Sequence, residues 1–173
     1  MATHTTIHAF TFSFYSSATR RRHDVFLSFR GPDTRHNITR NLHSALVDAG
    51  VTTFKDDVNI QKGSEIASDL LKAIQMSRIA IIVFSKNYAS SGWCLDELVK
   101  IVECKREVGQ IILPIFCDVD PSDVQQQMGT FSAALDVHER SGRTENKLEA
   151  WRTSLTEAAS QPYGFDMQDA AAW

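Results

Sequence analysis

The feature that most constrains the fold is an alternation of two kinds of segment from Asp24 onward. Short apolar segments alternate with longer ones whose apolar residues recur at helical spacing. Residues 79–84 (IAIIVF) have the length of one strand and no polar side chain, which is typical of a strand covered on both faces. Such an alternation predicts an α/β domain with a parallel sheet between layers of helices. The other expected strands are residues 25–29, 51–54, 111–116 and 163–166.

The segments between these strands are expected to be helical. Helices are predicted from about residue 38 to Gly50, from Ser64 to about residue 74, over 93–107, and in two pieces after Pro121. Residues 30–34 are expected to form a turn, and Pro114 places its strand near an edge of the sheet.

The chain is expected to contain one domain over residues 24–166. Residues 1–23 contain no Asp or Glu and end in three arginines, so we expect a flexible N-terminal tail, with an organelle transit peptide as the alternative. Residues 167–173 are expected to form a C-terminal tail.

Composition argues against several classes of partner. Eighteen Lys and Arg against 21 Asp and Glu give a net charge of −3, which does not favour nucleic acid as the main partner. The three cysteines form no C-x-x-C pair, so we expect no metal site and a reducing compartment. The apolar runs are too short to cross a membrane.

Strand order predicts where a site would lie. In the common order 2-1-3-4-5, a crevice opens at the carboxyl ends of the first and third strands. Residues 29–35 and 85–97 would border it, and the polar segment 55–63 is close enough to cover it. The residues there do not match a phospho-receiver, and the chain has no P-loop, G-x-G-x-x-G or G-x-S-x-G motif.

Two groups of residues in this crevice suggest chemistry. Arg30 and Arg35, with the backbone around Gly31, could hold phosphate oxygens. Trp93 and Glu97 are four residues apart and share a helix face, whereas Asp96 is expected to point elsewhere. The alternatives are that Glu97 is idle near a helix N-terminus, that Trp93 only packs, and that Arg30 pairs with Asp33 to stabilise the turn.

Five motifs then identify a family that this sequence resembles: residues 24–35 (DVFLSFRGPDTR), 54–57 (FKDD), 83–88 (VFSKNY), 91–98 (SGWCLDEL) and 114–121 (PIFCDVDP). In this order and spacing they closely resemble the Toll/interleukin receptor (TIR) domain of plant immune receptors and TIR-only proteins. The resemblance covers residues 24–166 and implies a flavodoxin-like fold, an open parallel five-stranded sheet in the order 2-1-3-4-5.

The resemblance also implies a function, since many plant members of this family are NAD(P)+ glycohydrolases. Glu97 would be the catalytic carboxylate, and NAD+ or NADP+ would be the substrate, with no permanently bound cofactor. The implied substrate contacts are Phe29, Arg30, Gly31, Arg35, Ser91 and Trp93. The implied mobile loop over the site includes Asp56, Asp57, Ile60, Lys62 and Gly63.

The implied partners are other TIR domains, and the nucleotide products would activate lipase-like helper complexes. The protein itself is expected in the cytoplasm, with the nucleus as the alternative. No membrane partner is expected. Arg40 and Asn41 replace a Ser-His pair used in one self-association interface of the family, and the family's last helix would lie after Asp166, so we expect both surfaces to differ here. The alternatives are a non-catalytic interaction module and, more weakly, a nucleic-acid-directed cyclic-nucleotide synthase.

Overall fold

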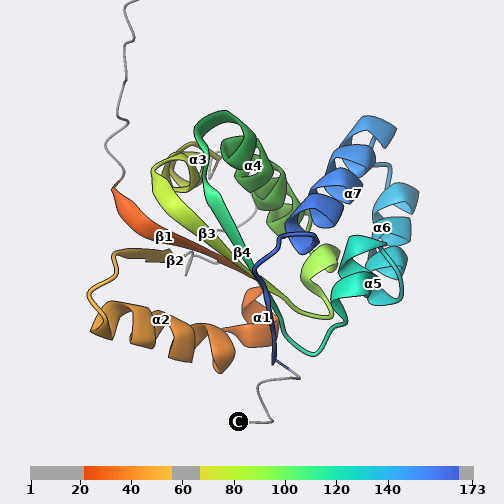
Figure 1. The fold of residues 1–173 in the computed structure, drawn as a ribbon. Coiled ribbons are helices and arrows are strands. Elements are labelled where there is room, and N and C mark those ends of the chain that lie inside the picture. Colours follow the sequence, from red (N-terminus) through yellow and green to blue (C-terminus); the bar gives the residue numbers. More distant parts are fainter. Residues whose placement is uncertain (1–21, 56–66, 168–173) are drawn as a thin grey trace, which may run out of the picture.

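A computed structural model describes residues 22–55 and 67–167, and within them a parallel sheet separates two layers of helices (Figure 1). The strand order is β2-β1-β3-β4-β5, and each neighbouring pair is parallel, which confirms the predicted topology. The strands are β1 (His23–Phe29), β2 (Thr53–Lys55), β3 (Ser77–Phe84), β4 (Ile111–Phe116) and β5 (Phe165–Asp166).

The helices follow the predicted positions with two differences. They are α1 (Gly31–Thr34), α2 (Ile38–Asp48), α3 (Ala67–Gln75), α4 (Gly92–Val108), α5 (Pro121–Gln125), α6 (Thr130–Arg140) and α7 (Glu145–Ala159), with a 3-10 turn η1 (Tyr88–Ser90) before α4. The predicted turn after β1 is the short helix α1, and three helices rather than two follow Asp120. The prediction was wrong here because helices this short carry too few residues to show an apolar period.

Local signals explain the ends of these helices. Pro121 stands at the start of α5, and the Asp120 carboxylate caps it by accepting a hydrogen bond from the Ser122 amide at 2.8 Å. Ser91 caps α4, and Gly109 ends that helix in the left-handed region at φ +68°. The helix that carries Trp93 and Glu97 therefore has a fixed start and a fixed end.

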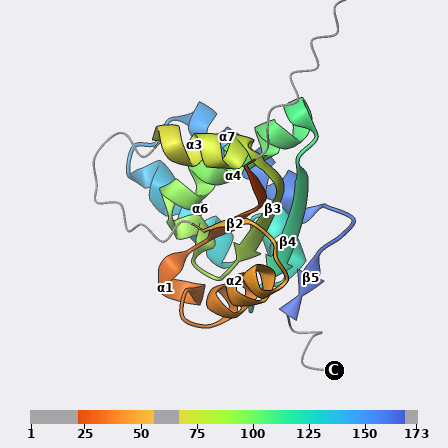
Figure 2. The same ribbon diagram turned by 90° about the vertical axis from the view of Figure 1, so that its left-hand side faces the viewer.

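The two faces of the sheet pack against different helices (Figure 2). Side chains on a strand alternate between faces, so Val25, Leu27 and Phe29 of β1 lie in the core beneath α2. Phe26 lies in the other, larger core, to which α3, α4, α6 and α7 contribute. Ser28 shares the face of Phe26 and is buried there as a polar residue.

β3 is the central strand, as predicted, and ends in the fully buried Phe84. The centre of the Phe84 ring lies 5.0 Å from the ring centre of Tyr88, 5.7 Å from that of Phe116 and 6.4 Å from that of Phe131. Phe84 therefore joins the central strand to η1, β4 and α6.

We expect Phe84→Ala to lower the free energy of unfolding by about 3–5 kcal/mol, because it leaves a cavity among three aromatic rings. Urea denaturation followed by circular dichroism measures the change. Phe165→Ala is the matched control, since that ring is 60% exposed and its loss should cost less than about 1 kcal/mol. Equal losses for the two variants would contradict the central place of Phe84.

Candidate active site

Glu97 is a residue of α4 and is buried, with only 6% of the residue exposed. The Ser28 hydroxyl of β1 donates a hydrogen bond to Glu97 Oε2 at 3.0 Å. Ser28 reaches it because it lies on the sheet face that packs against α4. A buried carboxylate requires such partners, since burial without hydrogen bonds is costly.

Tyr88 also contacts the Ser28 hydroxyl. Its phenol oxygen lies 3.0 Å from Ser28 Oγ, and the phenol donates to the Cys94 carbonyl at 3.2 Å. Burial raises the pKa of the Tyr88 phenol well above its ordinary value, with further contributions from Cys94 and Glu97. Tyr88 is therefore a neutral phenol at physiological pH.

Trp93 and Glu97 border one small cavity between α3 and α4, as their spacing on the helix predicts. The cavity has a volume of about 110 Å³ and is lined by Leu70, Leu71, Trp93, Asp96 and Glu97. Trp93 is 40% exposed, so its indole is accessible from solvent. The cavity combines an aromatic surface, two leucines and carboxylates.

The Asp96 carboxylate is directed at α7, in line with the prediction that it points elsewhere, although the residue also lines this cavity. Its carboxylate accepts a hydrogen bond from Trp151 Nε1 at 2.9 Å and pairs with Lys147 Nζ at 3.0 Å. Lys147 Nζ also lies 5.4 Å from the centre of the Trp151 ring. The contacts of Asp96 therefore connect α4 to α7.

Arg30 and Arg35, the two arginines after β1, both contact nearby residues of α1. Arg30 Nη1 pairs with Asp33 Oδ1 at 2.6 Å, the turn-stabilising pair that the sequence left open as the alternative. The Arg35 guanidinium packs on Gly31, where an added Cβ would lie 2.6 Å from Arg35 Nη2. A side chain at Gly31 would therefore displace Arg35.

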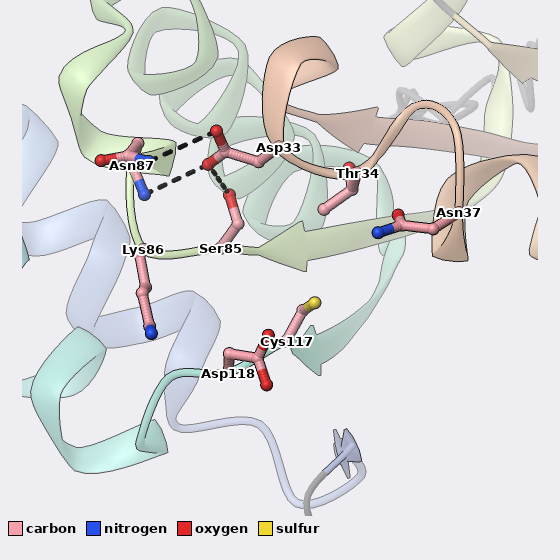
Figure 3. Close-up of a pocket in the computed structure, with 8 residues that line it drawn as sticks. All are labelled: Asp33, Thr34, Asn37, Ser85, Lys86, Asn87, Cys117 and Asp118. Carbon is pink, nitrogen blue, oxygen red and sulfur yellow. Dashed lines mark hydrogen bonds between the residues drawn. The ribbon is translucent and has the colours of Figure 1, made fainter.

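Asp33 ties the ends of β1 and β3 together (Figure 3). It accepts hydrogen bonds from the Ser85 hydroxyl at 2.6 Å and from the Asn87 backbone amide at 3.2 Å. Burial disfavours the charged carboxyl, but the Ser85 hydrogen bond and the Arg30 guanidinium outweigh it and hold the pKa of Asp33 below its ordinary value. These contacts join the carboxyl ends of β1 and β3, where the crevice was predicted.

A second, larger cavity lies beside these ties, at the carboxyl ends of β1, β3 and β4. It has a volume of about 230 Å³ and shares no lining residue with the cavity at Glu97. Its lining is Asp33, Thr34, Asn37, Ser85, Lys86, Asn87, Cys117 and Asp118. The segments 29–35 and 85–97, which were predicted to border one crevice, thus contribute residues to two separate cavities.

The structure does not place all predicted site residues beside Glu97. One lies on the other sheet face, one caps a helix, and the loop residues lie outside the described part of the chain. The Phe29 side chain lies in the core beneath α2, on the opposite sheet face from Ser28. The Ser91 hydroxyl accepts a hydrogen bond from the Cys94 amide at 3.2 Å as the cap of α4. The expected loop residues Asp56, Asp57, Ile60, Lys62 and Gly63 lie outside the described residues, as do Ser64, the N-terminal tail up to residue 21 and residues 168–173.

Sequence reasoning missed Ser28 and Tyr88. Ser28 could have been noticed in the sequence, because it is the one polar residue in the apolar segment 25–29. Tyr88 stands in a motif already noted, but its contact with Ser28 spans 60 positions and comes from the fold.

In the part of the chain that the structure describes, no group of three or more His, Cys, Asp and Glu residues could hold a metal ion. No helix within residues 22–55 and 67–167 is long and apolar enough to span a membrane. All three cysteines lie in this part, are buried, and form no disulfide.

Comparison with known proteins points to one family. The family model described as "TIR domain" matches residues 22–172. The chain is 54% identical over 138 residues to the disease resistance protein RPV1 of Vitis rotundifolia, covering 80% of this chain and 10% of that protein. It is 47% identical over 155 residues to the TMV resistance protein N of Nicotiana glutinosa, covering 89% of this chain and 14% of that protein.

A solved structure agrees in fold and sequence. The TIR domains in the activated Roq1 resistosome, which directly recognizes the pathogen effector XopQ, match with a TM-score of 0.79 and 44% identity. The match covers 87% of this chain and 90% of that chain. By contrast, the chain spans only 10% and 14% of the length of RPV1 and N.

The Asp33 contacts generate a pH-dependent prediction. Asp33→Asn should lower the free energy of unfolding at pH 7 by about 1–3 kcal/mol, because the Arg30 and Ser85 contacts lose their charged acceptor. A lowered pKa of Asp33 in the folded state contributes stability above the unfolded pKa, and this is lost as pH falls through the folded pKa. The difference between the proteins should therefore narrow below about pH 4.

Urea denaturation at a series of pH values from 7 to 3 measures this effect. Asp136→Asn is the control, since Asp136 is an exposed residue of α6. A difference between parent and Asp33→Asn that stays constant over this range would show that the charge of Asp33 does not stabilise the fold.

Proposed function

The chain belongs to the TIR domain family, and from this membership we propose that it is an NAD(P)+ glycohydrolase of the kind that signals in plant immunity. One observation carries the proposal. Glu97, a buried carboxylate, and Trp93, an exposed indole, line the same partly apolar cavity one helical turn apart. This arrangement offers a ring-stacking surface beside a negative charge in a site of restricted solvent access.

The proposed reaction breaks the bond between ribose C1′ and the pyridinium nitrogen. The electron pair of this bond passes to the nitrogen, so nicotinamide leaves as a neutral molecule without needing a proton. Water supplies hydroxide to C1′ and releases a proton, which gives ADP-ribose or its 2′-phosphorylated form. Positive charge develops on the ribose in the transition state, as in other glycoside cleavages.

Glu97 is suited to this chemistry as a single carboxylate. An ionised Glu97 would stabilise the positive ribose, bind a ribose hydroxyl or attack C1′ as a nucleophile. Ordinary glycosidases need a second carboxyl group as a proton donor, whereas a neutral leaving group does not. Asp96 is beside Glu97, but its carboxylate is engaged by Trp151 and Lys147 of α7.

The arginines are the proposed phosphate contacts, as the family resemblance implies. Arg30 is paired with Asp33 in this structure, so a substrate phosphate would compete with that carboxylate for the guanidinium. Arg35 lies against Gly31, close to the start of α1. We propose that substrate binding exchanges the Asp33 contact of Arg30 for a phosphate contact.

Self-association is part of the proposal because of the size of the cavity. At about 110 Å³ it is well below the roughly 300–1,000 Å³ typical of small-molecule sites, so it would admit one ring rather than a dinucleotide. The similar Roq1 TIR domains were solved within an activated resistosome. We propose that association of several copies widens the site here, and that lipase-like helper complexes sense the nucleotide products.

A non-catalytic TIR–TIR interaction module is the second candidate. The Arg30–Asp33 ion pair favours it, because this contact stabilises the chain without any substrate. In that case the carboxylate of Glu97 would have only a structural role.

Replacement of Glu97 tests the enzyme directly. Glu97→Gln should reduce nicotinamide release from NAD+ and NADP+ at least about 100-fold, because the neutral amide cannot stabilise the positive ribose. The assay uses purified protein at high concentration with a crowding agent. Glu103→Gln is the matched control, since it removes a carboxylate from the exposed side of the same helix and should retain release.

Asp96→Asn determines which carboxylate of the cavity carries the chemistry. Loss of release in Asp96→Asn but not in Glu97→Gln would move the assignment to Asp96. Absence of release from the parent, even when fused to an oligomerising scaffold, would favour the interaction module.

Association should also control the rate. Fusion of the chain to an oligomerising scaffold should raise nicotinamide release per chain at least about tenfold, because the scaffold increases the effective concentration of neighbouring domains. The same fusion carrying Glu97→Gln provides the background. A release rate per chain that does not depend on concentration or on the scaffold would remove self-association from the proposal.

A further inference from the structure

Three contacts in a row connect Glu97 to the backbone at the start of its own helix. They are Ser28 Oγ to Glu97 Oε2 at 3.0 Å, Ser28 Oγ to the Tyr88 hydroxyl at 3.0 Å, and the Tyr88 hydroxyl to the Cys94 carbonyl at 3.2 Å. All the side chains involved are buried. The contacts lead from Glu97 of α4 to Ser28 of β1, then to Tyr88 of η1, and back to α4 at the Cys94 carbonyl.

Counting hydrogens shows what this row can do. Ser28 and Tyr88 carry one hydroxyl hydrogen each, so they can complete two of the three contacts when Glu97 is ionised. When Glu97 is protonated, its own hydrogen points to Ser28, and the hydrogens of Ser28 and Tyr88 then complete the other two contacts. The same oxygens can therefore hold Glu97 in both charge states if the Ser28 hydroxyl reverses its direction, while Tyr88 donates to the Cys94 carbonyl in both.

We propose that Ser28, supported by Tyr88, is the positioning residue of Glu97, and that its hydroxyl reorients with the charge of that carboxylate. The proposal rests on the proposed glycohydrolase function, in which Glu97 faces a positive ribose. Glu97 would then keep one side-chain position throughout the reaction. Ser28 acts through Glu97 and touches no reacting atom.

The surroundings of Glu97 make this hydroxyl influential. The titratable groups near Glu97 include Tyr88 of η1, on which its charge acts, and Asp96 of α4, which lines the same cavity. Tyr88 stays neutral because burial raises the pKa of its phenol, and Asp96 has Lys147 as its counter-charge. On α4, Lys100 is one turn further along and pairs with Glu103. A hydrogen bond to an ionised carboxylate is about twice as strong as one between neutral groups, so removal of the Ser28 donor should weaken the ionised form of Glu97 more than the neutral form.

The experiment compares Ser28→Ala, Tyr88→Phe and a matched control in the full chain. The control is Ser77→Ala, which removes another buried strand hydroxyl, one that donates to the Ala73 carbonyl at 2.8 Å. Two quantities are measured for each protein. One is kcat and KM for nicotinamide release, and the other is the carboxyl ¹³C titration of Glu97, whose signal is identified by its loss in Glu97→Gln.

We expect Ser28→Ala to lower kcat about 10- to 100-fold with little change in KM, because a slightly misplaced carboxylate binds substrate but stabilises the transition state poorly. The Glu97 titration should move to higher pH in this variant, since the ionised form loses a donor. Tyr88→Phe should also lower kcat and move the Glu97 titration to higher pH, both by smaller amounts. Ser77→Ala should change neither kcat nor the titration.

An unchanged kcat and an unchanged Glu97 titration in Ser28→Ala would overturn the proposal, and so would equal effects in Ser77→Ala. The titration needs no substrate, which separates this proposal from the proposed function. If the parent releases no nicotinamide, the function fails, and the titration of Glu97 alone decides whether Ser28 controls it.

Discussion

The burial of β3 on both faces is the constraint on which the other features of this domain depend. β3 pairs with β1 on one side and with β4 on the other, and helices cover the sheet above and below. Most positions within such a sheet must be apolar, because a polar group there needs a partner. Chemistry is therefore confined to the carboxyl ends of the strands and to the first turns of the helices that follow them.

This constraint explains why the ends of the strands are tied by polar contacts. Asp33 after β1 accepts a hydrogen bond from Ser85 after β3, which links the ends of these two strands. Ser28 is the exception within β1, and its hydroxyl is satisfied by Glu97 and Tyr88. The residues predicted to border one crevice line two cavities, one at α3 and α4 and the other between α1 and the ends of β3 and β4.

Much of the fold could be predicted from the sequence because the alternation of apolar segments acts over many residues. The bounds of β4 agree residue by residue with the apolar run 111–116. The short helices α1 and α5 could not be predicted by period, although Pro32 and Pro121 mark their starts. A helix of one turn is decided by its capping groups rather than by an apolar face.

The site was predictable where neighbours lie on one helix and less so where they come from different elements. The pair Trp93 and Glu97 followed from the four-residue spacing. Ser28 and Phe29 are adjacent and point to opposite faces, but only the packing of α4 shows which face meets Glu97. Asp96 has its partner Trp151 at a separation of 55 positions, which no local pattern could indicate.

The two cavities have a consequence for the search for inhibitors. The larger one, about 230 Å³, is polar and lined by Asp33, Lys86 and Asp118, whereas the one at Glu97 is about half that size. Apolar fragments would therefore favour the cavity at Glu97, where Trp93 and two leucines form most of the lining, and polar or charged fragments would favour the larger one. Because the two cavities share no lining residue, a compound held in the larger one would occupy the domain without contacting Glu97, so binding to the domain and inhibition at Glu97 would have to be measured separately.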